Sequence, residues 1–452
     1  MSVSVSPAGR PLAAEVAEFA VGLRLEDIPA DVRRHVAWLL VDHAAVCTAG
    51  RPAAAAVIAA DHASEAYGGD AATALLDGRR LSAVGAAWAN GVLANVLDFD
   101  DGHRITKGHP GGMVIPASLA VAEAVGADLA ELVAAVVVGY EVAIRAGIRL
   151  HERERDYHAS GAWGSLGAAA AAGRLLGLDE DRLLHAIGLA EYHAPIALIM
   201  RSVADPAMTK DAVGWGAMLG TSSAQLAARG FTALGSTFLE SGPPMGFGQR
   251  WCLQEAYIKP YPCCRWTQPA IHAAVGLVTG RRFDSAAIER VVIETFEAAE
   301  GLSQRRPRTT EDMQYSLVWP VAVSLAEGDF DVDGVLRETV GDAVVDIAGR
   351  TVVRVDPEMT VRFPATRVSR VEVTLRDGSV LDSGVIEAPG EPGQAGWHDV
   401  IEGKARRYLR WDRQSPAVTV VDPPPLPLAG RGHEQLVSLL AYGLGTVVDV
   451  RG

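Results

Sequence analysis

The feature that most constrains the fold of this sequence is a helical repeat through its first half. From residue 12 to about residue 253, apolar side chains recur at intervals of three and four, the spacing of one helix face. Alanine, which loses no side-chain entropy in a helix, is abundant there together with glycine, so we expect helices packed backbone to backbone. The expected helices span residues 32–47, 83–97 (capped by Ser82), 116–125, 129–150, 164–175, 180–192 and 212–229.

The pattern changes near residue 257. Apolar and polar residues alternate at 288–295, 352–356 and 368–376, and the turn Asp377-Gly378 predicts a hairpin to residues 380–385. Helical patterns at 269–279, 315–326 and 332–338 lie between these strands, and tail helices are expected at 397–409 and 435–444, around a rigid connector at 422–427. We therefore predict a mainly α fold, with an all-helical domain at residues 1–260 plus 391–452 and a smaller α+β lid domain at 261–390.

Charge and hydropathy argue against two classes of partner. The 452 residues carry a net charge of −14 without a long basic run, so nucleic acid is not an expected partner. The most apolar stretch, residues 116–144, contains four acidic residues, so no membrane span is expected. The first 12 residues lack a basic region followed by an apolar run, so we expect no signal peptide and a cytoplasmic protein.

Cysteine usage fits an intracellular protein. The four cysteines are Cys47, Cys252, Cys263 and Cys264, too few for a disulfide scaffold in a chain of this length. They form no Cys-x-x-Cys pair of the kind that binds zinc.

A glycine-rich loop between two expected helices concentrates acidic and imidazole groups. It contains Asp98, Asp100, Asp101, His103 and His109. Aspartate and histidine can bind a metal ion, and equally an aspartate can orient a histidine for acid–base chemistry. A capped loop with solvated charges is the third alternative, and the loop alone does not separate the three.

Four later segments carry isolated polar residues. His158 precedes a helix of small residues, and Lys210 begins an apolar one. Lys259 and Arg265 lie in a segment stiffened by Pro260 and Pro262, and Tyr315 lies at an expected helix start. Taken singly, His158 is consistent with a structural histidine and Lys210 with a surface lysine. The segment of Lys259 and Arg265 is consistent with a rigid linker, and Tyr315 with a phenol that only packs.

Taken together, in this order and at these spacings, the segments resemble the MmgE/PrpD family, which includes 2-methylcitrate dehydratase, cis-aconitate decarboxylase and iminodisuccinate epimerase. The marks are Leu-Asp-Phe-Asp-Asp at 97–101 with His109-Pro110, Lys-Pro-Tyr-Pro-Cys-Cys-Arg at 259–265, and Gln-Tyr-Ser-Leu at 314–317. The resemblance implies a helical domain with an α/β lid, a homodimer, and catalysis without metal or cofactor. In its decarboxylase branch the polar site residues match Asp98, His109, His158, Lys210, Lys259 and Tyr315.

Two positions depart from the decarboxylase pattern. Gly102 stands where that pattern has a hydroxyl residue, and Cys264 stands where it has a histidine. The Cys-Cys-Arg form is more similar to the broader bacterial membership of the family, whose substrates are diverse.

From these residues we expect proton chemistry at a carbon next to a carboxylate, with a polycarboxylate as the small-molecule substrate. The expected catalytic residues are His109 and His158 as bases, Tyr315 as an acid, Lys210 as an anion stabiliser and Asp98 as an orienting group. The expected substrate-binding residues are Lys259, Arg265, Cys264 and His103, and no metal ligand is assigned.

The reaction favoured at this point is dehydration of a citrate-like hydroxy polycarboxylate. An epimerase or decarboxylase of a related di- or tricarboxylate is the alternative within the same chemistry. A non-catalytic carboxylate-binding protein and a metal-dependent lyase are alternatives of other classes. The segments at residues 260–262 and 389–393 are the expected hinges of the lid.

Overall fold

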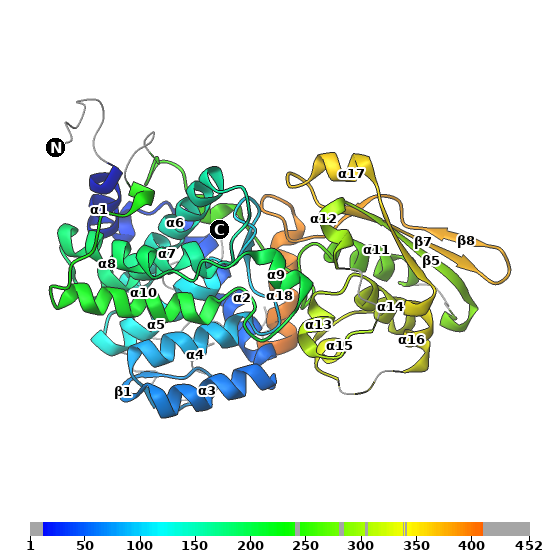
Figure 1. Cartoon of the computed structure of the whole chain (residues 1–452), viewed down its shortest axis with the longest axis horizontal. Helices are drawn as coiled ribbons and strands as arrows, with labels where there is room; N and C mark the ends of the chain where they lie inside the picture. The colour runs from blue at the N-terminus through cyan, green and yellow to red at the C-terminus, as the bar shows by residue number, and fades with distance from the viewer. Residues whose placement is uncertain are drawn as a thin grey trace.

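The computed structural model describes residues 12–239, 245–279, 284–302, 306–337, 339 and 341–409. Helices from the N-terminal half form one end of an elongated molecule, and a sheet covered by shorter helices forms the other (Figure 1). Helix α18 (Gly396–Leu409) lies where the two ends meet and packs against α2 (Ala30–Gly50) of the helical end.

The helical end is organised around α7 (Gly161–Leu175). This helix packs against α5 (Gly111–Val125), α6 (Leu129–Arg153), α8 (Glu180–Tyr192) and α10 (Val213–Ala228), and all but one of its residues are buried. A Cβ on Gly167 would collide with the backbone carbonyl of Gly139 in α6. Alanine and glycine are therefore required where α6 and α7 touch, as the composition indicated.

Helix ends follow ordinary capping chemistry. Ser82 caps α4 (Ala83–Asn95) by accepting a hydrogen bond of 3.2 Å from Gly85 N, and Asp128 and Asp179 cap α6 and α8 in the same way. Gly126 ends α5 in the left-handed conformation, with φ of 68°. These caps confirm the expected helices to within a few residues at most ends.

Three sequence predictions need correction. Helix α5 starts at Gly111, five residues before the expected start at Pro116, because two glycines and an internal proline conceal its first turn. Tyr315 does not start a helix, because α13 (Thr310–Gln314) ends there and α14 (Val318–Glu327) begins three residues later. The helical repeat expected from residue 12 is confirmed as α1 (Leu12–Gly22), but the pattern missed several other elements, listed here: α3 (Ala54–Ala66), β1 (Gly68–Thr73), β2 (Arg80–Leu81), α9 (Ile199–Ala204), α16 (Asp342–Gly349) and α17 (Pro357–Arg362).

The sheet at the other end has the strand order β6-β5-β7-β8, and β9 (Ile386–Glu387) also pairs with β7. Strand β5 (Ile288–Thr295) runs parallel to β6 (Thr351–Val355) and antiparallel to β7 (Val368–Leu375), which forms the expected hairpin with β8 (Val380–Asp382). Helix α11 (Gln268–Val278) packs on β7 and on α14, and α15 (Val332–Leu336) lies near α13. The fold is thus mainly helical with a small mixed sheet.

Two expectations for the tail differ in outcome. The helix expected at 397–409 is confirmed as α18, whereas the connector at 422–427 and the helix at 435–444 lie outside the described residues. No helix among the described residues has both the length and the apolarity needed to cross a bilayer. The domain boundaries at residues 260 and 390 stay a prediction.

Candidate active site

The loop between α4 and α5 places its aspartates inside the protein. Asp98 and Asp100 are 2% exposed, and Asp98 has a φ of 51°, in the left-handed region that non-glycine residues seldom occupy. The amide of Asn95 donates to Asp100 Oδ1 at 2.9 Å, and the hydroxyl of Tyr140 donates to Asp101 Oδ2 at 2.9 Å. Backbone strain at a buried carboxylate is typical of a functional site.

His109 is surrounded by oxygen atoms. Its Nε2 lies 3.2 Å from Asp98 Oδ1 and 3.6 Å from Asp211 Oδ2, and its Nδ1 lies 3.1 Å from Asp100 Oδ1. The carbonyl oxygen of Asp101 is a second acceptor near Nδ1, at 3.1 Å. An imidazole with acceptors at both nitrogens is best satisfied when both carry protons.

The electrostatics of the pocket agree with this geometry. Burial alone would lower the pKa of His109, but the charge of Asp100 and the hydrogen bonds to Asp100 and Asp98 raise it well above its ordinary value of 6.5. Burial alone would raise the pKa of Asp98, but Lys259 and His109 hold it below its usual range. The pKa of His109 is thus shifted in favour of the imidazolium, and its expected role as a base stays a prediction.

Lys259 reaches this loop from the segment that precedes α11. Its Nζ donates to Asp98 Oδ1 at 2.6 Å and to the Asp98 carbonyl at 2.9 Å, and its side chain is 1% exposed. Burial lowers the pKa of a lysine, but the charge of Asp98 outweighs this effect and leaves the pKa of Lys259 raised. Lys259 is thus a fixed ammonium inside the protein.

Lys210 and Tyr315 complete the cluster. Lys210 Nζ donates to Gln314 Oε1 and, at 3.4 Å, to the carbonyl of Val96. The phenol of Tyr315 donates to Asp211 Oδ2 at 3.3 Å. Burial and the charge of Asp211 raise the pKa of Tyr315 well above 10, whereas burial lowers the pKa of Lys210. The pocket therefore holds a protonated phenol and a second buried amine.

Five of the nine predicted site residues meet in this cluster: Asp98, His109, Lys210, Lys259 and Tyr315. Cys264 borders it, since burial and the nearby charge of Asp98 raise the pKa of its thiol to about 12. The backbone amide of His109 donates to the hydroxyl of Ser160 at 2.9 Å, which brings the segment containing His158 alongside. The Nδ1 atom of His158 is buried without a hydrogen-bond partner among the described residues.

Two predicted residues have other partners. His103 lies 3.4 Å from Glu255 and pairs through its backbone with Ala256 and Gly108. Arg265 binds Glu391 at 2.9 Å and the carbonyls of residues 388 and 389. Neither contacts His109 or Asp98, so their assignment to substrate binding stays a prediction.

Sequence reasoning left Asp211 and Gln314 without a role. Asp211 follows Lys210 directly, and both side chains reach the cluster because Lys210 and Ala212 have left-handed backbones with φ of 43° and 55°. Gln314 precedes Tyr315 and receives the Lys210 ammonium. Gln314 stood within a quoted motif and Asp211 next to a predicted residue, but adjacent side chains ordinarily point apart, so spacing gave no signal.

The space beside Gly102 is filled by an aromatic ring. Gly102 pairs with Tyr257 between β3 (Gly102–His103) and β4 (Ala256–Tyr257), and a Cβ on Gly102 would collide with the Tyr257 ring and hydroxyl. The Tyr257 ring in turn lies between the guanidinium groups of Arg265 and Arg367, whose central carbons are 5.1 and 5.0 Å from its centroid. Packing against Tyr257 thus requires glycine at position 102.

A metal ion is sterically conceivable at the cluster. One ligand atom from each of Asp98, His109 and Asp211 lies within 4.8 Å of the others. However, Lys259 already neutralises Asp98, and a metal would displace a proton from His109, whose pKa is raised. The donor set therefore fits a proton-transfer site better than a metal site.

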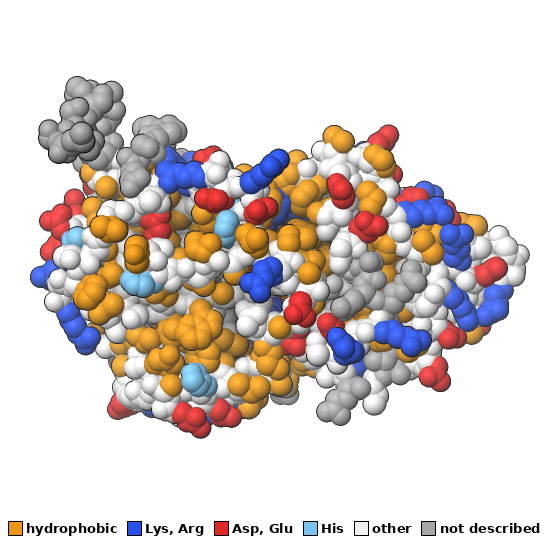
Figure 2. Space-filling model, viewed as in Figure 1, with side chains coloured by type: hydrophobic (Ala, Val, Ile, Leu, Met, Phe, Trp, Pro, Cys, Tyr) orange, Lys and Arg blue, Asp and Glu red, His pale blue; other side chains and the backbone are white. Residues whose placement is uncertain are grey.

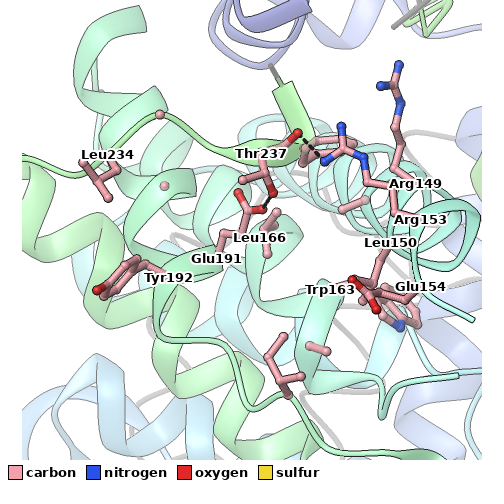
Figure 3. Close-up of a pocket in the computed structure, with 16 residues that line it drawn as sticks. Arg149, Leu150, Arg153, Glu154, Trp163, Leu166, Glu191, Tyr192, Leu234 and Thr237 are labelled. Atoms are coloured by element: carbon pink, nitrogen blue, oxygen red, sulfur yellow. Dashed lines mark hydrogen bonds between the residues drawn. The ribbon is translucent and has the colours of Figure 1, made fainter. Parts of the chain in front are cut away.

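A large cavity lies apart from this cluster. It has a volume of about 890 Å³ and is bounded by α6, α7, α8 and the segment at 234–238 (Figure 3). Arg153 donates to the carbonyl of Thr237 at 2.7 Å, and the Thr237 hydroxyl bonds Glu191 across this cavity. None of the nine predicted site residues lines it.

The chain is similar to several proteins named cis-aconitate decarboxylase. The cis-aconitate decarboxylase of Aspergillus terreus is 24% identical over 420 residues, 82% of this chain and 84% of that protein. The enzyme of the same name from Mus musculus is 27% identical over 333 residues, 67% of each chain. The human enzyme of that name is 37% identical over 129 residues, a quarter of each chain.

Family models cover nearly all of the described chain. The MmgE/PrpD N-terminal domain matches residues 14–257, and the MmgE/PrpD C-terminal domain matches residues 261–414. This chain therefore belongs to the MmgE/PrpD family of enzymes.

Proposed function

We propose that this protein is a lyase that decarboxylates a tricarboxylate of the cis-aconitate class, using side chains alone. The observation that carries the proposal is the buried cluster in which Lys259 and His109 both contact Asp98, beside Lys210 and Tyr315. The names of the similar proteins favour decarboxylation over the dehydration that we expected from the sequence.

Decarboxylation of such a substrate requires a sink for electrons. The bond to the leaving carboxylate breaks, carbon dioxide departs, and the electron pair moves through the conjugated double bond onto a remaining carboxylate. The ammonium of Lys259, and Lys210 when protonated, supply fixed positive charge for that anion in a buried pocket. Such preorganised charge is commonly the largest contribution to catalysis.

The anion then needs a proton on carbon. The His109 imidazolium and the Tyr315 phenol are both protonated at neutral pH. The aspartates raise the pKa of His109 against the effect of burial, whereas burial and the charge of Asp211 together raise the pKa of Tyr315. Asp98 and Asp100 hold the imidazole ring between them and keep it charged. His158, whose Nδ1 has no hydrogen-bond partner in the described chain, is retained as a further proton-transfer candidate.

The proposal is tested by product analysis in deuterated water. Chelator-treated protein would be incubated separately with cis-aconitate and citrate and followed by NMR. Loss of carbon dioxide from cis-aconitate, with deuterium on the product carbon, is the expected result. Water loss from citrate with cis-aconitate unchanged would overturn decarboxylation in favour of dehydration, and deuterium exchange without net change would indicate epimerisation.

A pair of histidine variants tests the site itself. His109→Gln is expected to lower turnover by roughly 10²–10⁴-fold, because it removes the charged proton donor. His62→Gln is the matched control, since His62 is an exposed residue of α3 whose ring packs against those of Tyr67 and Trp88. Equal turnover of the two variants would remove His109 from the mechanism.

We also propose that the protein is a homodimer. Exposed apolar side chains gather over α8 and the segments that follow α8 and α10, where Tyr192 and Leu234 are each 73% exposed and Ile196 is 63% exposed. Orange apolar surface is visible over much of this end of the molecule (Figure 2). Apolar patches of this kind usually mark an interface. Light scattering after gel filtration should give twice the chain mass, and Leu234→Glu should give the monomer mass.

A further inference from the structure

Three arginines converge on a single buried carboxylate beside the candidate site. Arg265 Nη2 lies 2.9 Å from Glu391 Oε1, Arg104 Nη2 lies 2.5 Å from Oε2, and Arg367 Nη1 lies 3.6 Å from Oε1. Burial raises the pKa of Glu391, but the three guanidinium groups outweigh it and lower the pKa to about 2. Glu391 is thus ionised and supplies one negative charge to three positive ones.

Arg367 is the least satisfied of the three. Its side chain is 2% exposed, and its Nη2 donates to the carbonyl of Arg104 at 3.1 Å. Its Nε and Nη1 have no hydrogen-bond partner among the residues that the structure describes, and the 3.6 Å from Nη1 to Glu391 Oε1 is too long for a hydrogen bond. An ionised guanidinium that is buried with two unused donors is costly, and an anion on those donors would remove the cost.

Lys107 adds a fourth cation on the open side of the cluster. Its ammonium lies 3.0 Å from the centroid of the Tyr157 ring and 5.2 Å from that of Phe363. No carboxylate is paired with it among the residues that the structure describes. Burial and the charge of Arg367 lower the pKa of Lys107 to about 7, as expected for an amine near uncompensated positive charge.

The excess positive charge lies next to the candidate active site. Lys107 is two residues before His109, on the loop that carries the aspartates. The Arg367 guanidinium lies over Tyr257, which is two residues before Lys259 and whose hydroxyl packs against Gly102. The cations therefore border the cluster at the junction of the helical end with the segment 363–391.

We propose that Arg367 and Lys107 form an anion subsite that binds a carboxylate of the substrate remote from the reacting carbon. The inference rests on the proposed function and extends it, because it makes the number of carboxylates the basis of substrate selection. The free Nε and Nη1 of Arg367 point in different directions, and each can donate a charge-assisted hydrogen bond to a carboxylate oxygen. Lys107 supplies a charge at the half-exposed edge of the subsite. A bound carboxylate raises the pKa of Lys107 and so favours its ammonium form.

Binding of citrate as a probe, measured by calorimetry at fixed ionic strength, tests the subsite without turnover. Lys107→Met is expected to weaken citrate binding by about tenfold or more, and Arg367→Lys by a similar factor, since each removes a charge-assisted contact. Binding of succinate, which lacks the third carboxylate, should be weaker than that of citrate in the wild type and should change less than threefold in Lys107→Met.

Arg370→Met is the control, because Arg370 lies in an exposed ion-pair network with Asp382 and Glu294 on β7 and should leave citrate binding unchanged. Lys107 is half-buried and its variant is expected to fold, with an unfolding temperature close to that of the wild type. Equal affinity for citrate in Lys107→Met and wild type would overturn the subsite. A protein that binds citrate through Lys107 yet converts no tricarboxylate would retain the subsite and lose only the proposed reaction.

Discussion

The ion pair between Lys404 and Asp42 gives the sharpest prediction about how the site loop is held. Lys404 lies on α18 and Asp42 on α2, and the two side chains are 3% and 1% exposed. Lys404 Nζ donates to Asp42 Oδ1 at 2.7 Å and to the carbonyl of Phe99 at 2.8 Å. Because Phe99 separates Asp98 from Asp100, this ammonium fixes the loop that holds His109.

The size of the effect follows from the geometry. At 2.7 Å the attraction between the two charges is about 6 kcal/mol if the effective dielectric constant is about 20. Lys404→Met removes it and leaves Asp42 as an isolated buried carboxylate, whose pKa is already raised by burial despite Lys404. Removing one partner of a buried pair typically costs about 3–5 kcal/mol, and uptake of a proton by Asp42 would keep the cost within that range.

The assay is urea unfolding of the wild type and two variants with activity measured alongside. Lys404→Met should lose about 3–5 kcal/mol and most of its turnover, whereas Lys404→Met combined with Asp42→Leu should recover more than half of the stability. The double variant should not recover activity, because the contact to the Phe99 carbonyl stays lost. A loss below about 1 kcal/mol in the single variant, as for an exposed pair, would refute the reasoning.

Three further predictions concern the same loop. Gly102→Ala should destabilise the protein by about 1–3 kcal/mol in thermal unfolding because its Cβ collides with Tyr257, whereas Gly276→Ala in α11, with open space around the Cβ, should not. The contribution of Asp101 to stability should fall as pH rises from about 4 to 7, because burial and Asp100 raise the pKa of Asp101 to about 7, so that the folded state keeps a proton which the unfolded state releases. Asp101→Asn should flatten that dependence in urea unfolding at the two pH values; an unchanged slope would contradict it. Turnover should persist above pH 6.5 and decline only as pH rises through the raised pKa of His109; a decline centred at 6.5 would contradict the acid role.

Periodicity in the sequence was sufficient to predict most of the architecture. The spacing of apolar residues located α2, the helices from α4 to α8 and α10, and alternation located β5, β6, β7 and the hairpin to β8. Composition also anticipated the close contact of α6 and α7, where Gly167 meets Gly139. These features are local, because helix and strand periods are properties of neighbouring residues along the chain.

Motif order indicated which polar residues to examine, and the structure brought five of the nine together. Motif order could not indicate that the pKa of His109 is raised, because that depends on Asp100 and Asp98 lying near the two nitrogens of the ring. Nor could it reveal the role of Asp211, since that depends on the left-handed backbone on either side of it.

By itself, therefore, the sequence determined the helical and strand segments, the family motifs and the types of polar side chain available. Only the tertiary structure decided that Lys404 would neutralise Asp42 across 362 residues of chain, and that Arg367 would be buried with unused donors. The physical reason is that pKa values and unpaired donors depend on burial and on charges a few ångströms away. Those neighbours come from distant parts of the chain, and no local pattern encodes them.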